Sequence, residues 1–295
     1  MTSMSAAEQT TQGLATELVL YAGCLPATPF REFVAAAASA EFDAITLWPL
    51  MYRRAQSREG LDPATMRRIV DDAGLRITDI DSCGDWLPAP VAGGDVQPAF
   101  RSVWSRHEFF AAAAALGADT LVAVHLTGDD TSHDLAVEGF ASLCDDAAEH
   151  GLRIALEFIP FSGVRDLAAG WSIVRESGRA NSGLVFDVCH VVRSGSDTGL
   201  LQSIPAERIL SVQLGDGSLA APADLVDEAM YHRALPGDGE FGVGALLGQL
   251  CGLGVRSRVG PELYQTGWSQ RPAAEVAADL MDATRRILTA SSSSP

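Results

Sequence analysis

Eight short apolar runs rich in strand-forming residues recur along the 295-residue chain, and helix-forming stretches separate them. The strand-like runs lie at 18–23, 44–48, 76–81, 120–126, 153–158, 183–188, 209–214 and 259–264. This alternation is typical of a parallel sheet with crossover helices, and eight repeats favour a closed barrel over an open sheet. No GxGxxG follows the first run, which also disfavours a dinucleotide-binding sheet. We therefore predict a single α/β domain, a (β/α)₈ TIM barrel.

The expected boundaries follow from the first strand and the last helix. Residues 18–288 are expected to form the barrel, 1–17 a flexible N-terminal segment and 289–295, which ends in "SSSSP", a disordered tail. The long connections at 82–98 and 215–241 are rich in Gly, Pro and Asp. They are expected to be loops that follow strands, where barrels build their active sites, and not a second domain.

Composition excludes several classes of partner. The formal net charge is −17, with 38 acidic and 21 basic side chains, which would repel nucleic acid and anionic membranes. The N-terminus lacks the basic and apolar regions of a signal peptide, and no apolar run approaches the roughly 18 residues of a membrane span. Five scattered cysteines without a CxxC pair do not suggest disulfides. We expect a cytoplasmic protein with a small-molecule partner. The sequence leaves open whether the protein forms a homo-oligomer.

Polar residues interrupt each of the last four strand-like runs near its C-terminal end. They are Glu157, Asp187, Gln213 and Glu262. Because side chains alternate along a strand, their face-mates are the smaller residues Ala155, Val185, Ser211 and Gly260, so all four are expected to face the barrel interior. Three acids and an amide cannot neutralise one another, and an unpaired buried carboxylate is unfavourable. The pattern predicts one divalent cation, Mn²⁺ first with Mg²⁺ or Co²⁺ as alternatives. In the alternative without a metal, each acid pairs separately with an arginine or a backbone N–H donor.

Other polar and aromatic residues fall near the same end of the barrel. His190 follows Asp187 by three residues, and His125 lies at the end of the fourth run, either as a base or as a hydrogen-bonded rim residue. Trp48 and Trp86 lie after the second and third runs. Either indole could form a flat wall for a sugar or cyclitol ring, or pack in the core.

Five segments, in this order, carry a family resemblance. They are "IALEFIPF", "NSGLVFDVCHVVRSG", "ILSVQLGDG", "HRALPGDGEFGVGALLGQLCGLG" and "VGPELY". They resemble the sugar phosphate isomerase/epimerase group, xylose isomerase-like barrels that include ketose 3-epimerases and inosose dehydratases. The resemblance implies that Glu157, Asp187, Gln213 and Glu262 bind one divalent metal. It implies substrate-binding roles for His190 and Arg233. Gly163 stands where ketose 3-epimerases carry a further Glu, and Gln213 is a weaker, neutral third ligand than the His that the family also uses.

A cation beside a vicinal hydroxy-ketone would acidify the α-proton by stabilising the enediolate. With Glu157 and Glu262 on either side, we predict a metal-dependent isomerase or epimerase acting on a keto-sugar or cyclitol. Loss of a β-oxygen from the same intermediate would make the protein a lyase, such as an inosose-type dehydratase or an enzyme eliminating from a keto-glycoside. Protonation of the leaving group by His190 or His125 would favour this alternative.

Two other classes are weaker alternatives. A metal-dependent endonuclease of the related barrel type would use several metals and many His ligands, against which six His and the net charge of −17 argue. A non-catalytic sugar-binding barrel would not need a cluster of metal ligands.

Overall fold

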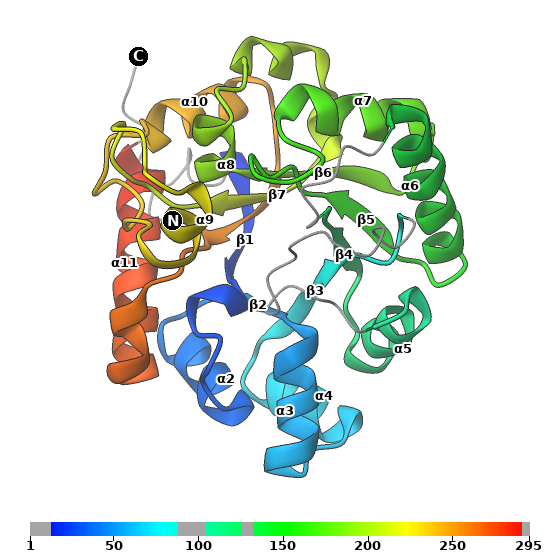
Figure 1. The fold of residues 1–295 in the computed structure, drawn as a ribbon. Coiled ribbons are helices and arrows are strands. Elements are labelled where there is room, and N and C mark those ends of the chain that lie inside the picture. The colour runs from blue at the N-terminus through cyan, green and yellow to red at the C-terminus, as the bar shows by residue number, and fades with distance from the viewer. Residues whose placement is uncertain (1–12, 88–103, 126–131, 291–295) are drawn as a thin grey trace, which may run out of the picture.

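Eight parallel strands close into a barrel in the computed structural model, which describes residues 13–87, 104–125 and 132–290 (Figure 1). The strands are β1 (Ala15–Leu20), β2 (Ala44–Leu47), β3 (Arg76–Cys83), β4 (Thr120–Ala123), β5 (Arg153–Leu156), β6 (Ser182–Asp187), β7 (Ile209–Leu214) and β8 (Ser257–Pro261). Each strand pairs in parallel with the next, and β8 pairs with β1 to close the ring. The predicted (β/α)₈ barrel is confirmed.

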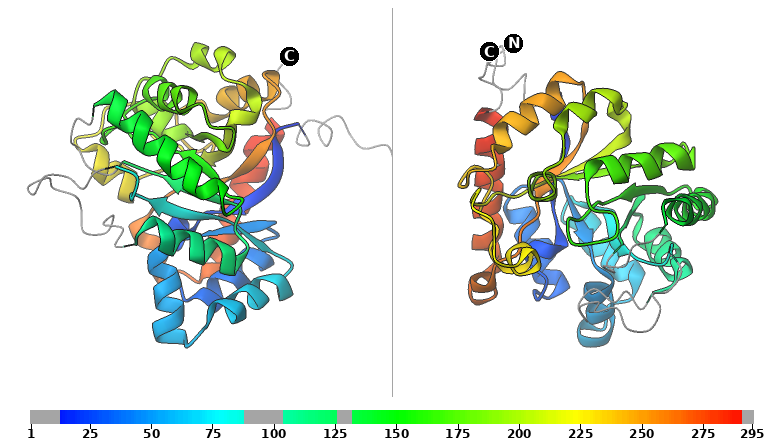
Figure 2. Two further views of the ribbon diagram at one scale, coloured as in Figure 1. Left: turned by 90° about the vertical axis from the view of Figure 1, so that its right-hand side faces the viewer. Right: turned by 45° about the horizontal axis from the view of Figure 1, so that its top comes forward.

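Helices surround the strands. They are α2 (Phe30–Ser39), α3 (Pro49–Glu59), α4 (Pro63–Asp72), α5 (Arg106–Leu116), α6 (His133–Ala148), α7 (Leu167–Ser177), α8 (Val188–Arg193), α9 (Leu225–Tyr231), α10 (Val243–Gly252) and α11 (Ala273–Ala290). Short 3₁₀ helices are η1 (Ala22–Cys24), η3 (Thr198–Ser203), η4 (Ala206–Arg208) and η5 (Thr266–Gln270). Figure 2 shows neighbouring helices such as α6 and α7 side by side outside the strands. The last helix, α11, packs against α2 and completes the outer ring.

Local sequence signals account for individual helix ends. Helix α4 starts after Asp62, because the Asp62 side chain accepts a hydrogen bond from the Thr65 backbone N–H and Pro63 occupies the first helical position. The connection from β6 to β7 carries α8 and then two 3₁₀ helices, η3 and η4.

Side chains of the strands separate into two layers, as their alternation predicts. Ala155 and Val185 pack in an interior cluster with Val122 and Val124. The alternate residues, such as Leu156, Leu184 and Phe186, belong to the larger cluster that the helices cover. Asp187 therefore shares the inward face of Val185 and lies two residues further along β6, toward the C-terminal mouth.

A network of charges closes the opposite, N-terminal end of the barrel. Arg258 on β8 is 5% exposed, and its guanidinium lies 3.2 Å from Asp79 Oδ1 and 2.5 Å from Asp119 Oδ1. Arg76 and Arg153 also contact Asp119, at 3.2 and 3.4 Å. Since each charge has an opposite partner, this network stabilises the barrel end away from the predicted site.

The barrel domain begins before and ends after the residues expected from the sequence. β1 begins at Ala15, Leu14 is buried, and α11 continues to Ala290. The remainder of the expected terminal segments, 1–12 and 291–295, lies outside the described residues. Among the helices of the described ranges, none has the length and apolar character needed to cross a membrane.

Candidate metal and substrate site

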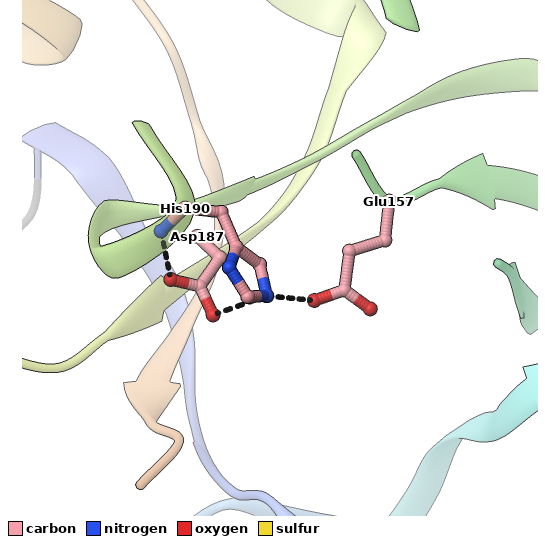
Figure 3. Close-up of side chains that lie close together, drawn as sticks. All are labelled: Glu157, Asp187 and His190. Carbon is pink, nitrogen blue, oxygen red and sulfur yellow. Dashed lines mark hydrogen bonds and ion pairs between the residues drawn. The ribbon is translucent and has the colours of Figure 1, made fainter. Parts of the chain in front are cut away.

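Glu157, Asp187 and His190 converge at the C-terminal mouth of the barrel (Figure 3). Glu157 follows β5, Asp187 ends β6 and His190 lies in the first turn of α8. His190 Nε2 is 3.4 Å from Glu157 Oε1 and 3.6 Å from Asp187 Oδ2. All three residues are buried, and one ligand atom from each lies within 4.8 Å of the others. This spacing is suitable for a shared metal ion.

Asp187 joins strand β6 directly to helix α8. Its Oδ1 accepts a hydrogen bond of 3.0 Å from the His190 backbone N–H, so the carboxylate caps the helix. Its Oδ2 accepts a bond of 2.9 Å from Arg233 Nη1. Burial alone would raise the pKa of Asp187, but the charges of Arg233 and His190 outweigh burial and hold this pKa below its ordinary value. Asp187 is therefore ionised, which is the form in which a carboxylate would bind a cation.

The loop between β7 and α10 holds Arg233 in place. Asp216 and Ala234 exchange backbone hydrogen bonds of 2.8 and 3.0 Å. The Asp216 carboxylate also accepts from three backbone N–H groups of the loop, those of Gly217, Gly237 and Phe241. Arg233 Nη1 donates in addition to the Glu262 carbonyl oxygen at 2.9 Å. The loop thus fixes a buried guanidinium between β6 and β8.

Gln213 has an unsatisfied side chain at the same end of the barrel. It pairs with Asp187 across β6 and β7 and is 0% exposed. Neither its Oε1 nor its Nε2 has a hydrogen-bond partner within the described part of the chain. A buried amide without a partner is destabilising, so this position fits an oxygen ligand better than a structural glutamine.

Carboxyl groups outnumber cationic groups in the site. Burial, and next the nearby charges of Glu157, Asp81 and Asp187, raise the pKa of Glu262 well above its ordinary value, while Arg233 opposes them. Burial and the charge of Glu157 likewise raise the pKa of Asp81. A divalent cation would relieve this repulsion and give the Gln213 oxygen a partner, so the residues present fit the expected metal. Asp81 is an additional acid beyond the predicted ligands.

The predicted aromatic residues occupy different environments. Trp48 is partly exposed, stacks on Tyr264 with ring centroids 5.7 Å apart, and lies near enough to Asp81 to oppose the rise in the pKa of that carboxyl. Trp86 is 2% exposed, and its Nε1 donates to the Val124 carbonyl oxygen at 2.8 Å. The structure therefore places Trp48 beside the acids and Trp86 in the core layer.

His125 lies against Gly163. Its Nδ1 accepts a hydrogen bond of 3.0 Å from the Gly163 backbone N–H, which in a neutral imidazole leaves the proton on Nε2. A Cβ atom on Gly163 would lie 2.4–2.8 Å from three atoms of the His125 ring. The absence of a side chain at this position is therefore required for the observed place of His125.

Sequence reasoning missed Tyr264 and Asp216. Tyr264 follows Glu262 by two residues, so strand alternation could have placed both on one face. Asp216 follows β7 in "QLGDG", but only the folded loop brings Gly237 and Phe241 to its carboxylate.

A protein-family model described as xylose isomerase-like TIM barrel matches residues 34–287. The chain is 27% identical over 229 residues to a 3-dehydroshikimate dehydratase of Pseudomonas aeruginosa, which covers 77% of this chain and 35% of that protein. It is 29% identical over 156 residues to an inosose isomerase of Bacillus velezensis, covering 52% of this chain and 55% of that protein. The matches thus span about a third to about half of these curated relatives.

A solved structure supports the fold independently. The crystal structure of the IOLI protein with a binding zinc atom superimposes with a TM-score of 0.81. The two chains are 18% identical, and the superposition covers 92% of this chain and 98% of the other. At this identity the likeness establishes the shared barrel.

Proposed function

Because the chain belongs to the xylose isomerase-like TIM barrel family, we propose that it is a divalent-metal-dependent enzyme that removes the proton next to the carbonyl of a cyclic polyhydroxy ketone. The observation that carries this proposal is the convergence of Glu157, Asp187 and His190 within reach of one ion. Of these three, Glu157 and Asp187 would be metal ligands, and His190 would lie beside the ion. The Gln213 amide, which pairs with Asp187 across two strands and has no partner among the described residues, supports a further oxygen ligand.

Glu157, Asp187, Gln213 and Glu262 would hold the cation. Oxygen donors of this kind suit Mn²⁺, Mg²⁺ or Co²⁺, and the zinc named for the IOLI protein makes Zn²⁺ worth including in any assay. A bound cation would polarise the substrate carbonyl and offset the negative charge that develops when the neighbouring proton leaves.

The chain's own residues would handle the proton. Glu157 and Glu262 are the candidate groups that accept and return it, because they follow β5 and β8, three strands apart around the mouth, and their charges still interact. His190 Nε2, 3.4 Å from Glu157 Oε1, is placed to exchange a proton with that carboxylate after a small movement. Arg233 would orient the substrate from beside Asp187 while keeping that carboxylate ionised.

The relatives suggest the class of substrate. 3-Dehydroshikimate and inosose are both six-membered carbon rings that carry a ketone next to hydroxyl groups. The removal of a proton beside that ketone can begin both a dehydration and an isomerisation. A cyclic polyhydroxy ketone is therefore the substrate class we propose, and it includes the cyclitols expected from the sequence.

One observation favours elimination as the outcome, which would make the protein a lyase. Ketose 3-epimerases, in the resemblance described above, carry a second carboxylate where this chain has Gly163, and the His125 ring fills the adjoining space. A neutral imidazole with its proton on Nε2 can donate that proton to a departing hydroxyl group. The relative that matches the larger part of the chain is also named a dehydratase. We therefore place the lyase ahead of the isomerase, which reverses the order expected from the sequence.

Incubation in D₂O tests the proposal. The protein is loaded with Mn²⁺, Mg²⁺, Co²⁺ or Zn²⁺ and mixed with 3-dehydroshikimate or an inosose, and the products are followed by NMR. Elimination predicts loss of water and a new conjugated double bond, whereas epimerisation predicts a deuterated epimer. Glu157→Gln, which keeps the side-chain size, should abolish either reaction. Absence of both deuterium incorporation and water loss with every metal would refute proton abstraction from this substrate class.

A further inference from the structure

We propose that Trp48 and Tyr264 form an aromatic platform that makes the site select ring-shaped polyols over open-chain ones. This inference rests on the proposed function and narrows its substrate class. The two rings stack with centroids 5.7 Å apart and an interplanar angle of 30°. They come from opposite ends of the chain, since Trp48 follows β2 and Tyr264 follows β8.

The platform lies next to the carboxyl groups of the site. The Trp48 side chain lies near Asp81, whose carboxyl is close enough to Glu157 for their charges to interact. Tyr264 lies two residues after Glu262, and Arg233 Cζ is 5.8 Å from its ring centroid. An aromatic surface at this position would contact a substrate whose oxygens reach the cation.

Partial exposure distinguishes these two rings from the aromatic core. Trp48 and Tyr264 are both intermediate in exposure, whereas Phe158 and Phe186 on the helix-facing layer are 1% and 0% exposed. Two large aromatic side chains left partly uncovered beside charged groups form a surface that a ligand can cover.

Gly23 holds Tyr264 in its orientation. A Cβ atom on Gly23 would lie 2.7 Å from Cε1, Cζ and the hydroxyl oxygen of Tyr264. The phenol ring thus lies against the backbone of η1, in a slot that an alanine would close. Because Trp48 stacks on the Tyr264 ring, the two rings are held together before any ligand binds.

Ring chemistry explains the expected selectivity. One face of a cyclic polyol presents several C–H groups together, and these are attracted to the negative face of an aromatic ring. An open-chain polyol presents no such persistent face and loses more rotational freedom on binding. The platform should therefore strengthen binding of a ring and contribute little to an open chain.

myo-Inositol and D-mannitol are matched probes, because each has six carbons and six hydroxyl groups. Their affinities for the Mn²⁺-loaded protein are measured by calorimetry, together with the affinity for Mn²⁺ itself. The wild type should prefer inositol. Tyr264→Leu or Trp48→Leu should weaken inositol binding by about 5- to 10-fold and leave mannitol and Mn²⁺ binding unchanged. Tyr264→Phe keeps the ring and should keep the preference, while Gly23→Ala should reduce it without touching the ligand.

The outcomes separate this inference from the proposed function. An inositol preference that survives in Tyr264→Leu or, if that variant does not fold, in Trp48→Leu and Gly23→Ala would overturn the platform while leaving metal binding and proton abstraction intact. Failure to bind Mn²⁺ would count against the proposed function. In that case the ratio of the inositol affinity to the mannitol affinity is measured on the metal-free protein, and it still decides whether the platform selects rings.

Discussion

Arg233 Nη1 lies 2.9 Å from Asp187 Oδ2, and these side chains are only 5% and 1% exposed. The pair joins the end of β6 to the loop that precedes α10 and lies beside the imidazole of His190. Because the guanidinium keeps Asp187 ionised, it neutralises a buried negative charge and leaves the carboxylate in the form that a metal ion would bind.

Arg233→Met should destabilise the metal-free protein. The substitution leaves the Asp187 carboxylate buried without its guanidinium partner, and breaking such an ion pair costs about 3–5 kcal/mol. Urea unfolding in the presence of a chelator measures the loss. The double variant Arg233→Met/Asp187→Asn should lose less than the single variant, since it removes the stranded charge. Asp187→Asn alone completes the cycle, and a loss in the double variant equal to the sum of the two single losses would show that the two residues are not coupled.

Gln213→Leu should have opposite effects on stability and metal binding. Leucine removes a buried amide with no partner among the described residues, and such a group costs about 1–3 kcal/mol. The metal-free variant should therefore resist urea better than the wild type, while its affinity for Mn²⁺ falls. Gln213→His, which restores a donor atom, should recover metal binding. A leucine variant with unchanged Mn²⁺ affinity would remove Gln213 from the ligand set.

Gly163→Ala should destabilise the protein through His125. The added Cβ would lie within 2.4–2.8 Å of the ring, and overpacking of this kind costs about 1–3 kcal/mol. His125→Ala in the same chain should remove most of this penalty, as thermal unfolding of the four proteins in a double-mutant cycle would reveal. Gly248→Ala in α10 is the matched control, because nothing lies within 4 Å of its Cβ position. Additive effects of the two substitutions would contradict the contact.

Asp119→Asn should make stability less dependent on acid pH. Burial would raise the pKa of Asp119, but hydrogen bonds and charge from Arg258 outweigh it and lower this pKa in the folded protein. A lowered carboxyl pKa contributes stability above its unfolded value of about 3.9, and this contribution is lost as pH falls toward the folded value. The difference in melting temperature between wild type and variant should thus be largest near pH 7 and shrink below about pH 4. Asp238→Asn on the exposed loop serves as the control, and a gap that stays constant with pH would disagree with the network.

Much of this architecture could be predicted from alternating patterns along the chain. The eight repeats indicated the barrel, and strand alternation placed Ala155 and Val185 inside it. The same rule placed Asp187 at the mouth, because the residue belongs to the strand itself. Periodicity is local information, and it is sufficient where a side chain's direction follows from its own strand.

The contacts between distant loops could not be predicted in this way. Arg233 reaches Asp187 across 46 positions, and His125 meets Gly163 across 38. Trp48 stacks on Tyr264 only because the barrel closes β8 onto β1. These pairs depend on how loops return over the barrel mouth, which no repeat in the sequence specifies.

The central claim is that Glu157, Asp187, Gln213 and Glu262 bind one divalent cation. A crystal structure of the protein grown with Mn²⁺, with an anomalous difference map to locate the metal, tests this claim most directly. The account predicts a single strong peak with oxygens of all four side chains at about 2.0–2.6 Å. A map without a peak among these residues, or a peak bound by Glu157, Asp187 and the His190 imidazole while Gln213 and Glu262 stay apart from it, would contradict the account.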